Sequence, residues 1–305
     1  MRDAFITELT TIAHEDKNVI LLTADLGFGV LDQFRKELPK QFINVGIAEQ
    51  NMIGLATGLA LEGYIVYCYS IANFPTLRCL EQIRNDAAYH QANVKIVSVG
   101  GGLSYGPLGM SHHATEDLAI LRVLPGVQVL VPSTLREASA GARHLYKTPG
   151  VQYFRLDKSF AKDSVEIGEI DLNSWKVLTE GNEICIVSVG GILEETILAR
   201  EILLKEGVEV RLVSATDLTP NSIEMVMKSI SHPKLLISVE EHVTSGGLGG
   251  LLAEIISGLG ENIRLIRLGV QPEFVSTVGS QKYLRNIHGI SAKEIARAAS
   301  AAKYL

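Results

Sequence analysis

Short runs of apolar, often β-branched residues alternate along this chain with longer stretches in which apolar positions recur at helical spacing. The runs at 19–23, 94–98 and 184–189 show the first kind of pattern. Such runs are typical of parallel strands that are buried on both faces by the helices that connect them. The pattern therefore predicts an α/β protein built from doubly wound sheets.

The same pattern places the individual elements. In the first half it predicts strands at 19–23, 64–69, 94–98, 128–131 and 152–155, and helices at 3–14, 49–61, 76–85, 117–122 and 134–147. In the second half it predicts strands at 183–189, 209–214, 234–239 and 262–267, and helices at 193–206, 222–229, 248–259 and 292–303. The strand-helix alternation thus occurs twice, which predicts two sheets.

Between the two halves, from Ala161 to Glu180, the periodicity is lost and the sequence becomes acidic. We therefore expect a first domain at 1–165, a linker at 166–181 and a second domain at 182–305. A chain of 305 residues is long enough for two domains of about 150 residues, each with its own core.

Charge and composition exclude several classes of protein. The 28 basic and 34 acidic residues give a net charge of −6 and form no basic run, so nucleic acid is not an expected partner. The apolar runs are far shorter than the roughly 20 residues that span a bilayer, and the start lacks a secretory signal, so we expect a cytoplasmic protein without a membrane segment. Cys68, Cys79 and Cys185 are widely spaced, which predicts reduced core thiols rather than disulfides or a zinc site.

Residues 44–60 place a lone carboxylate, Glu49, at the start of a helix that contains Gly54 and Gly58. Small residues allow such a helix to lie close to a neighbour. Taken alone, Glu49 is more simply interpreted as an exposed first-turn carboxylate that is stabilised by the helix dipole.

A glycine-rich loop at 100–113 follows a predicted strand and ends in His112 and His113. Loops after parallel strands gather ligand-binding groups at one edge of a sheet. Two adjacent histidines rarely point at a common ion, so we expect no metal to be held by this chain. By themselves, Asp25 fits a turn or helix cap, and Phe74 fits an ordinary core position.

The segment 46–52, Gly-Ile-Ala-Glu-Gln-Asn-Met, resembles the pyrimidine-binding signature of transketolases and 1-deoxyxylulose-5-phosphate synthases. The similarity extends over most of the chain, from residues 1–5 through 23–26 to 279–281. The sequence is also similar to the β subunits of 2-oxoacid dehydrogenases. The resemblance implies a pyrimidine-binding domain, a transketolase C-terminal-like domain and the cofactor thiamine diphosphate.

The resemblance also implies roles around the cofactor. Glu49 corresponds to the carboxylate that hydrogen-bonds the aminopyrimidine and promotes the loss of the thiazolium proton, a task that needs an exchangeable proton. Leu26 corresponds to the residue that props the bent cofactor, with Asp25 beside it. Phe74 matches the ring that stacks on the pyrimidine, and Ile71 replaces an aromatic found in many relatives.

For the substrate, His112 corresponds to a histidine that faces the reacting carbon and manages hydroxyl protons, and His113 either supports it or caps the next helix. Arg2 and Arg155 correspond to arginines that hold the terminal phosphate of sugar substrates. Either arginine taken alone fits a surface salt bridge equally well.

Three positions depart from the family pattern. Gly29 and Gly100 stand where relatives have a serine and a histidine that contact phosphate, and Leu108 stands where an aspartate reads a donor hydroxyl. The donor site is thus expected to be less polar than in ordinary transketolases. The segment around Glu241 and His242 resembles a packing and subunit-contact segment, so neither residue is expected to be catalytic.

Full-length relatives bind the diphosphate and Mg²⁺ (or Ca²⁺) with a Gly-Asp-Gly motif and a downstream asparagine, and this sequence has neither. The resemblance therefore implies a separate N-terminal transketolase subunit that carries the diphosphate and metal, in an α2β2 heterotetramer.

The leading expectation is transfer of a two-carbon ketol unit from a ketose or ketose phosphate to an aldose. A thiamine-dependent synthase or dehydrogenase that decarboxylates a 2-oxo acid is the alternative, which Leu108 keeps open. A catalytically silent scaffold is a third, and the presence of Glu49 argues against it.

Overall fold

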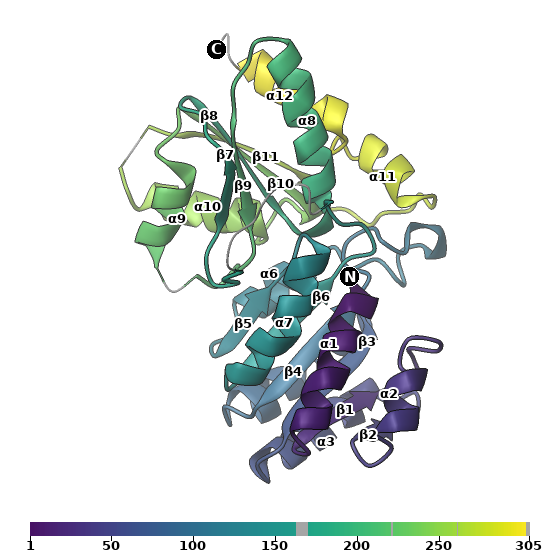
Figure 1. Ribbon diagram of the computed structural model, residues 1–305. Helices are drawn as coiled ribbons and strands as arrows, with labels where there is room; N and C mark the ends of the chain where they lie inside the picture. Colours follow the sequence, from purple (N-terminus) through teal and green to yellow (C-terminus); the bar gives the residue numbers. More distant parts are fainter. Residues whose placement is uncertain (163–169, 221, 261, 303–305) are drawn as a thin grey trace.

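The computed structural model describes residues 1–162, 170–220, 222–260 and 262–302. These residues form two α/β domains, each with one β-sheet that has helices packed on both faces (Figure 1). The predicted fold class, two doubly wound sheet domains, is confirmed. In Figure 1 the N-terminal domain lies below the C-terminal domain, and helix α1 begins close to their junction.

The first sheet has six strands among the described residues, in the order β2-β1-β3-β4-β6-β5, and every neighbouring pair is parallel. Its strands are β1 (Val19–Thr23), β2 (Phe42–Asn44), β3 (Ile65–Ile71), β4 (Val94–Val99), β5 (Val127–Leu130) and β6 (Val151–Leu156). All residues of β1, β4 and β6 are buried, because helices cover both faces.

On one face lie α1 (Arg2–Glu15) and α7 (Leu135–Lys147), which pack side by side (Figure 1). Helix α7 begins where the Thr134 side chain accepts a hydrogen bond from the Glu137 amide. The other helical segments are α2 (Asp32–Glu37), α3 (Glu49–Leu61), α4 (Phe74–Leu77), α5 (Leu80–Gln82), the π-helical turn Ile83–Ala88, the 3₁₀ turn Gly106–Leu108 and α6 (Asp117–Arg122). The single helix predicted at 76–85 is wrong, because it is interrupted at Cys79 and continues with π-helical hydrogen bonding.

The second sheet has the order β11-β10-β8-β9-β7 in the described part of the chain. Its strands are β7 (Lys176–Thr179), β8 (Ile184–Val189), β9 (Arg211–Ala215), β10 (Leu235–Val243) and β11 (Arg264–Val270). Its helices are the 3₁₀ turn Gly190–Ile192, α8 (Leu193–Lys205), α9 (Ile223–Ile230), α10 (Leu248–Ser257), α11 (Gln281–Ile287) and α12 (Ala292–Ala302). Helices α8 and α12 pack together against one face of this sheet, as Figure 1 shows.

The predicted linker at 166–181 needs correction. Strand β7 lies inside this range and pairs antiparallel with β9, so the second sheet begins before residue 182. Trp175, just before β7, is buried and donates its indole N–H to the carbonyl of Asp217 at 2.8 Å. The predicted domain boundary after residue 165 falls at 163–169, outside the described residues.

The two domains share a continuous apolar core. One cluster joins Leu118 and Val129 of the first domain to Val213 and Leu248 of the second. The three cysteines are free and buried, as predicted. Among the described helices, none is both long enough and apolar enough to cross a bilayer.

Candidate active site

Most of the residues singled out in the sequence lie where strands of the first sheet end. Asp25 follows β1, Glu49 follows β2, Phe74 follows β3 and His112 follows β4. Because the carboxyl ends of parallel strands meet at one edge, the fold brings residues from distant parts of the sequence together there.

Glu49 is the first residue of α3, and its side chain is only 2% exposed. One oxygen, Oε2, accepts a hydrogen bond from Arg78 Nη1 at 2.6 Å. The Arg78 side chain is 47% exposed, so the cation that balances this buried carboxylate comes from the solvent side. Glu49 is therefore not the exposed first-turn carboxylate that was the alternative from the sequence alone.

The same arginine contacts Phe74. Its Cζ atom lies 4.9 Å from the centre of the Phe74 ring, within the range of a cation–π interaction. Phe74 also meets the His112 imidazole edge-on, with ring centres 5.3 Å apart. Glu49, Phe74 and His112 thus form one group, and Arg78 bridges its first two members.

Other residues predicted to contact the cofactor lie at the ends of β1 and β3. Asp25 has φ 55° and exchanges hydrogen bonds with Asn44, whose side-chain oxygen accepts from the Asp25 amide at 2.9 Å. Asp25 therefore has the turn role that its sequence context allowed. Leu26 and Ile71 are half-buried. Asn73 donates to the carbonyl of Ser111, and its buried Oδ1 has no hydrogen-bond partner among the described residues.

The two histidines of the 100–113 loop have different environments. His112 is half-buried, and its Nδ1 lies 3.0 Å from the hydroxyl of Ser111. His113 is buried, and its Nε2 donates to the carbonyl of Gly106 at 3.3 Å. Burial lowers the pKa of His113, so it is neutral near neutral pH. His113 therefore supports the loop, and His112 is the histidine beside Phe74. No group of three metal-binding side chains occurs in the described residues.

Arg155 and Arg2 have different surroundings. Arg155 is 2% exposed, and its guanidinium contacts Asp117, Asp157 and the carbonyl of Glu241. Burial raises the pKa of Asp157, whereas the Arg155 cation beside it acts in the opposite direction. These contacts argue against a direct phosphate contact by Arg155, because its donors are already used inside the protein. Arg2 is exposed and pairs only loosely with Asp3, at 3.4 Å.

A cation that the sequence reasoning missed lies near Arg2. Lys158 Nζ is 3.7 Å from the centre of the Tyr105 ring. Burial, and then the nearby Arg2 charge, lower the pKa of Lys158. Tyr105 in turn approaches His112, with ring centres 6.2 Å apart. Lys158 lies three residues after Arg155, and no feature of the sequence indicates that Arg155 is buried whereas Lys158 lies near Arg2.

Gly100 and Leu108 show how this edge differs from the family pattern. A Cβ on Gly100 would lie 2.0 Å from the Tyr105 ring, and φ at Gly100 is +83°. Tyr105 thus occupies the space beside the position where relatives carry a histidine. Leu108 is 54% exposed, and Phe28, Ile47 and Met110 are exposed apolar residues on loops at the same strand ends. Apolar side chains left open around a buried carboxylate fit a site that another molecule covers.

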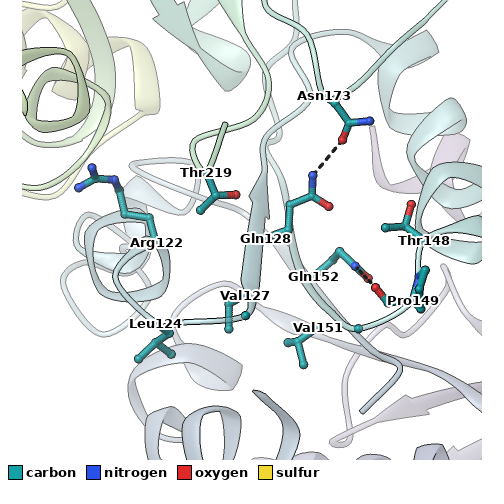
Figure 2. Close-up of a pocket in the computed structure, with 12 residues that line it drawn as sticks. Arg122, Leu124, Val127, Gln128, Thr148, Pro149, Val151, Gln152, Asn173 and Thr219 are labelled. Carbon is teal, nitrogen blue, oxygen red and sulfur yellow. Dashed lines mark hydrogen bonds between the residues drawn. The ribbon is translucent and has the colours of Figure 1, made fainter. Parts of the chain in front are cut away.

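A cavity of about 650 Å³ lies elsewhere, at the opposite ends of strands β5 and β6 (Figure 2). Its lining amides are paired: Gln128 donates to Asn173 and Gln152 donates to the carbonyl of Pro149, as the dashed lines in Figure 2 show. The charged residue in the lining, Arg122, forms an ion pair with Glu254. Among the described residues, the lining contains no carboxylate, histidine or cysteine, so we assign the chemistry to the edge around Glu49.

Comparison with known proteins identifies the family of both domains. Residues 1–162 match the family described as transketolase, pyrimidine binding domain, and residues 173–295 match transketolase, C-terminal domain. A protein of Methanocaldococcus jannaschii described as a transketolase C-terminal section is 34% identical, over 97% of this chain and 94% of its own length. One subunit of the apulose-4-phosphate transketolase of Phocaeicola vulgatus is also 34% identical, over 87% of this chain and 86% of its own.

A solved structure described as a split gene transketolase, an inactive beta4 tetramer, has 32% identity and a TM-score of 0.88. It covers 98% of this chain, and this chain covers 97% of it. Both domains and nearly the whole length are therefore accounted for, and the chain belongs to the transketolase family, as a C-terminal section of its split form.

Proposed function

We propose that this chain is the pyrimidine-binding subunit of a thiamine-diphosphate-dependent transketolase that transfers a two-carbon ketol unit from a ketose or ketose phosphate to an aldose. The observation that carries the proposal is the group formed by Glu49, Phe74 and His112, with one buried carboxylate, one aromatic face and one imidazole. Family membership implies the cofactor, and this group fits the half of it that carries the pyrimidine.

The fit rests on the contacts that Arg78 makes. Its guanidinium, which is planar and carries N–H donors, hydrogen-bonds Glu49 and lies against Phe74. An aminopyrimidine is also planar, with a ring nitrogen and an amino group, so it suits the same two partners. The unpartnered Oδ1 of Asn73 is a further acceptor at this edge of the described structure. Thiamine diphosphate, when bound, supplies the carbon nucleophile that cleaves the bond beside a ketose carbonyl.

The chain's own residues then have separate tasks. Glu49 shares a proton with the ring nitrogen, and its burial strengthens that hydrogen bond. Phe74, with Leu26 and Ile71, gives the ring an apolar wall. His112 takes and returns a proton at a substrate hydroxyl. Arg2 and Lys158 together offer positive charge to the anionic end of a sugar phosphate.

The proposal includes a partner subunit that holds the diphosphate and Mg²⁺ or Ca²⁺, in an α2β2 assembly. Relatives described as a C-terminal section and as one subunit of a transketolase support a partner, as does the related assembly of β chains alone, which is described as inactive. The exposed apolar residues around Glu49 are consistent with a partner that covers them. A cytoplasmic location is also part of the proposal and rests on the sequence.

The test is reconstitution. The chain is purified alone and with an N-terminal transketolase subunit from the same organism. Each preparation is then supplied with thiamine diphosphate, Mg²⁺ and a panel of ketose phosphates, free ketoses and pyruvate, with an aldose acceptor. We expect ketol transfer only from the mixture. Turnover by the chain alone would remove the partner from the proposal. Carbon dioxide release from pyruvate, without transfer from any ketose, would instead establish 2-oxo acid decarboxylation.

A further inference from the structure

The loop at 100–113 has two sides with different surroundings. Its front carries His112, beside Phe74. Its back is embedded in the second domain, where Leu103 is fully buried in a small apolar cluster with Val243, Val270, Val275 and Leu284. A segment that carries an active-site imidazole is thus supported by a domain that contributes none of the group around Glu49.

A buried carboxylate of the second domain makes a direct polar contact to this loop. Glu241, near the end of β10, is 3% exposed. Its Oε2 accepts the backbone amide of Leu103 at 3.0 Å and the side-chain amide of Gln281 at 2.9 Å. Its Oε1 pairs with Arg285 Nε, and Arg285 Nη2 also donates to the hydroxyl of Ser159 at 2.6 Å. Both oxygens of the carboxylate are therefore held in place.

The loop fits against this support without spare room. A Cβ on Gly102, which has φ +58°, would lie 2.5 Å from Glu241 Cβ. A Cβ on Gly106 would lie 2.4 Å from the carbonyl oxygen of Gly279. The far side of the loop is tied back to this point, because His113 donates to the carbonyl of Gly106. The loop is therefore packed closely against Glu241 on one side and Gly279 on the other.

We propose that Glu241 is a positioning residue for the substrate-handling loop: by holding the Leu103 amide, it sets where His112 lies relative to Phe74. A hydrogen bond to an ionised acceptor is stronger than one to a neutral group, which suits a contact that must fix a loop. The second domain acts on the reaction through this contact without touching the substrate. The consequence for catalysis rests on the proposed role of His112, whereas the loop contact does not.

The test compares Glu241→Ala and Glu241→Gln with Glu240→Gln in the assembled enzyme. Glu240 is the matched control: it is also a buried β10 carboxylate, but it accepts the amides of Leu248 and Gly249 at the start of α10. For Glu241→Ala we expect amide hydrogen exchange in residues 100–113 to become about tenfold faster or more. Glu241→Gln, which keeps an acceptor, should show a smaller effect. Glu240→Gln should leave exchange in this loop unchanged.

Kinetics supply the second readout. A misplaced His112 should lower kcat/KM for the ketose by about 10- to 100-fold in Glu241→Ala, and Glu241→Gln should restore part of the loss. Cofactor affinity and exchange of the thiazolium C2 proton should not change, because Glu49 and Phe74 do not depend on this contact. A general loss of structure would change all of these quantities together.

Unchanged loop exchange in a folded Glu241→Ala, or an equal effect in Glu240→Gln, would overturn the proposal. If Glu241→Ala does not fold, Glu241→Gln and Gly106→Ala decide the question, since the latter presses the loop off Gly279 from the other side. If the enzyme shows no ketol transfer at all, the proposed function fails, and the exchange measurement on the same protein still decides the loop contact.

Discussion

The carboxyl ends of the strands in the two sheets differ in how their buried carboxylates are satisfied. Glu49, at the edge of the first sheet, accepts from Arg78, which reaches it from the solvent side. Glu240 and Glu241, at the edge of the second sheet, accept from backbone amides and buried side chains. The exposure of the three side chains is almost the same, between 0 and 3%. Burial therefore does not distinguish Glu49 from Glu240 and Glu241. What distinguishes them is whether the hydrogen-bond donors come from the solvent side or from inside the protein.

This difference assigns separate tasks to two similar architectures. In the proposed function, the first edge, whose carboxylate is paired with one exposed cation, exchanges that cation for the cofactor. An edge whose carboxylates are held by internal donors is rigid and serves as a platform. The four predictions that follow test this contrast, beginning with the largest effect.

Replacing Glu49 with Gln should lower turnover of the assembled enzyme by about 10²–10⁴-fold, because glutamine accepts a hydrogen bond but cannot exchange the proton. The fold and the assembly should persist. Thiazolium C2 proton exchange, followed by NMR, and sedimentation of the complex measure the two parts. Glu62→Gln at the exposed end of α3 is the control. If the thiazolium C2 proton exchanges in Glu49→Gln as fast as in the wild type, the assignment of Glu49 to the cofactor site is wrong.

Arg155→Met should lower the free energy of unfolding by about 3–5 kcal/mol, because it leaves Asp117 and Asp157 buried without their cation. Arg2→Met should change it by less than about 0.5 kcal/mol, because Arg2 is exposed. Arg2→Met should instead raise KM for phosphorylated substrates. Urea unfolding and steady-state kinetics measure both quantities. Equal stability effects at the two positions would contradict the structural role of Arg155.

The buried carboxylate of Glu240, in the second sheet, should also make the free energy of unfolding depend on pH. Burial raises the pKa of Glu240 to about 7, from an ordinary value of 4.5, despite the two amides that favour its charged form. Between these values the folded protein keeps a proton that the unfolded chain has lost. The free energy of unfolding should therefore fall as pH rises from about 4.5 to about 7, by up to about 3–4 kcal/mol in total.

In Glu240→Gln this fall should be smaller than in the wild type, and in the exposed control Glu62→Gln it should be unchanged. Urea unfolding between pH 5 and pH 8 compares the three proteins. A fall of the same size in Glu240→Gln would show that another group causes it.

The smallest effect concerns two glycines in helices of the first domain. A Cβ on Gly54 in α3 would meet nothing within 4 Å, whereas one on Gly141 in α7 would lie 2.1 Å from the Phe154 ring. Gly54→Ala should therefore stabilise the isolated chain by about 1 kcal/mol, and Gly141→Ala should destabilise it by about 1–3 kcal/mol. If α3 packs against another subunit, Gly54→Ala should also weaken assembly, which sedimentation measures. Stabilisation with unchanged assembly would place α3 outside the interface.

The sequence predicted the long elements well, because helices such as α3 and strands such as β8 contain enough positions to show a period. It missed α2, β2, β7 and α11, which have between three and seven residues. Strand β7 was also hidden in an acidic stretch, and it forms by pairing with β9 more than 30 residues away. Short elements of this kind depend on tertiary partners rather than on local pattern.

At the site, the family signature led to Glu49, and its position-by-position extension led to Phe74 and His112, which the fold then brought together. Arg78 and Lys158 were missed, because their roles depend on which side chains neighbouring loops place beside them. The fate of Arg155 could not be predicted either. Its buried partners include a carbonyl of the second domain, 86 residues further along the chain.

The contact between the domains has a further consequence at the outer strand of the first sheet. Strand β5 is the outermost strand on one side of the first sheet. The second domain covers the edge of β5 that does not pair with β6. Leu130 bridges antiparallel to Asp217, the Val131 amide donates to Thr216, and the amide of Leu218 donates to Val129. An uncovered strand edge recruits other chains and promotes aggregation. The second domain therefore keeps this edge from pairing with other chains, and a first domain produced without it is expected to self-associate through β5.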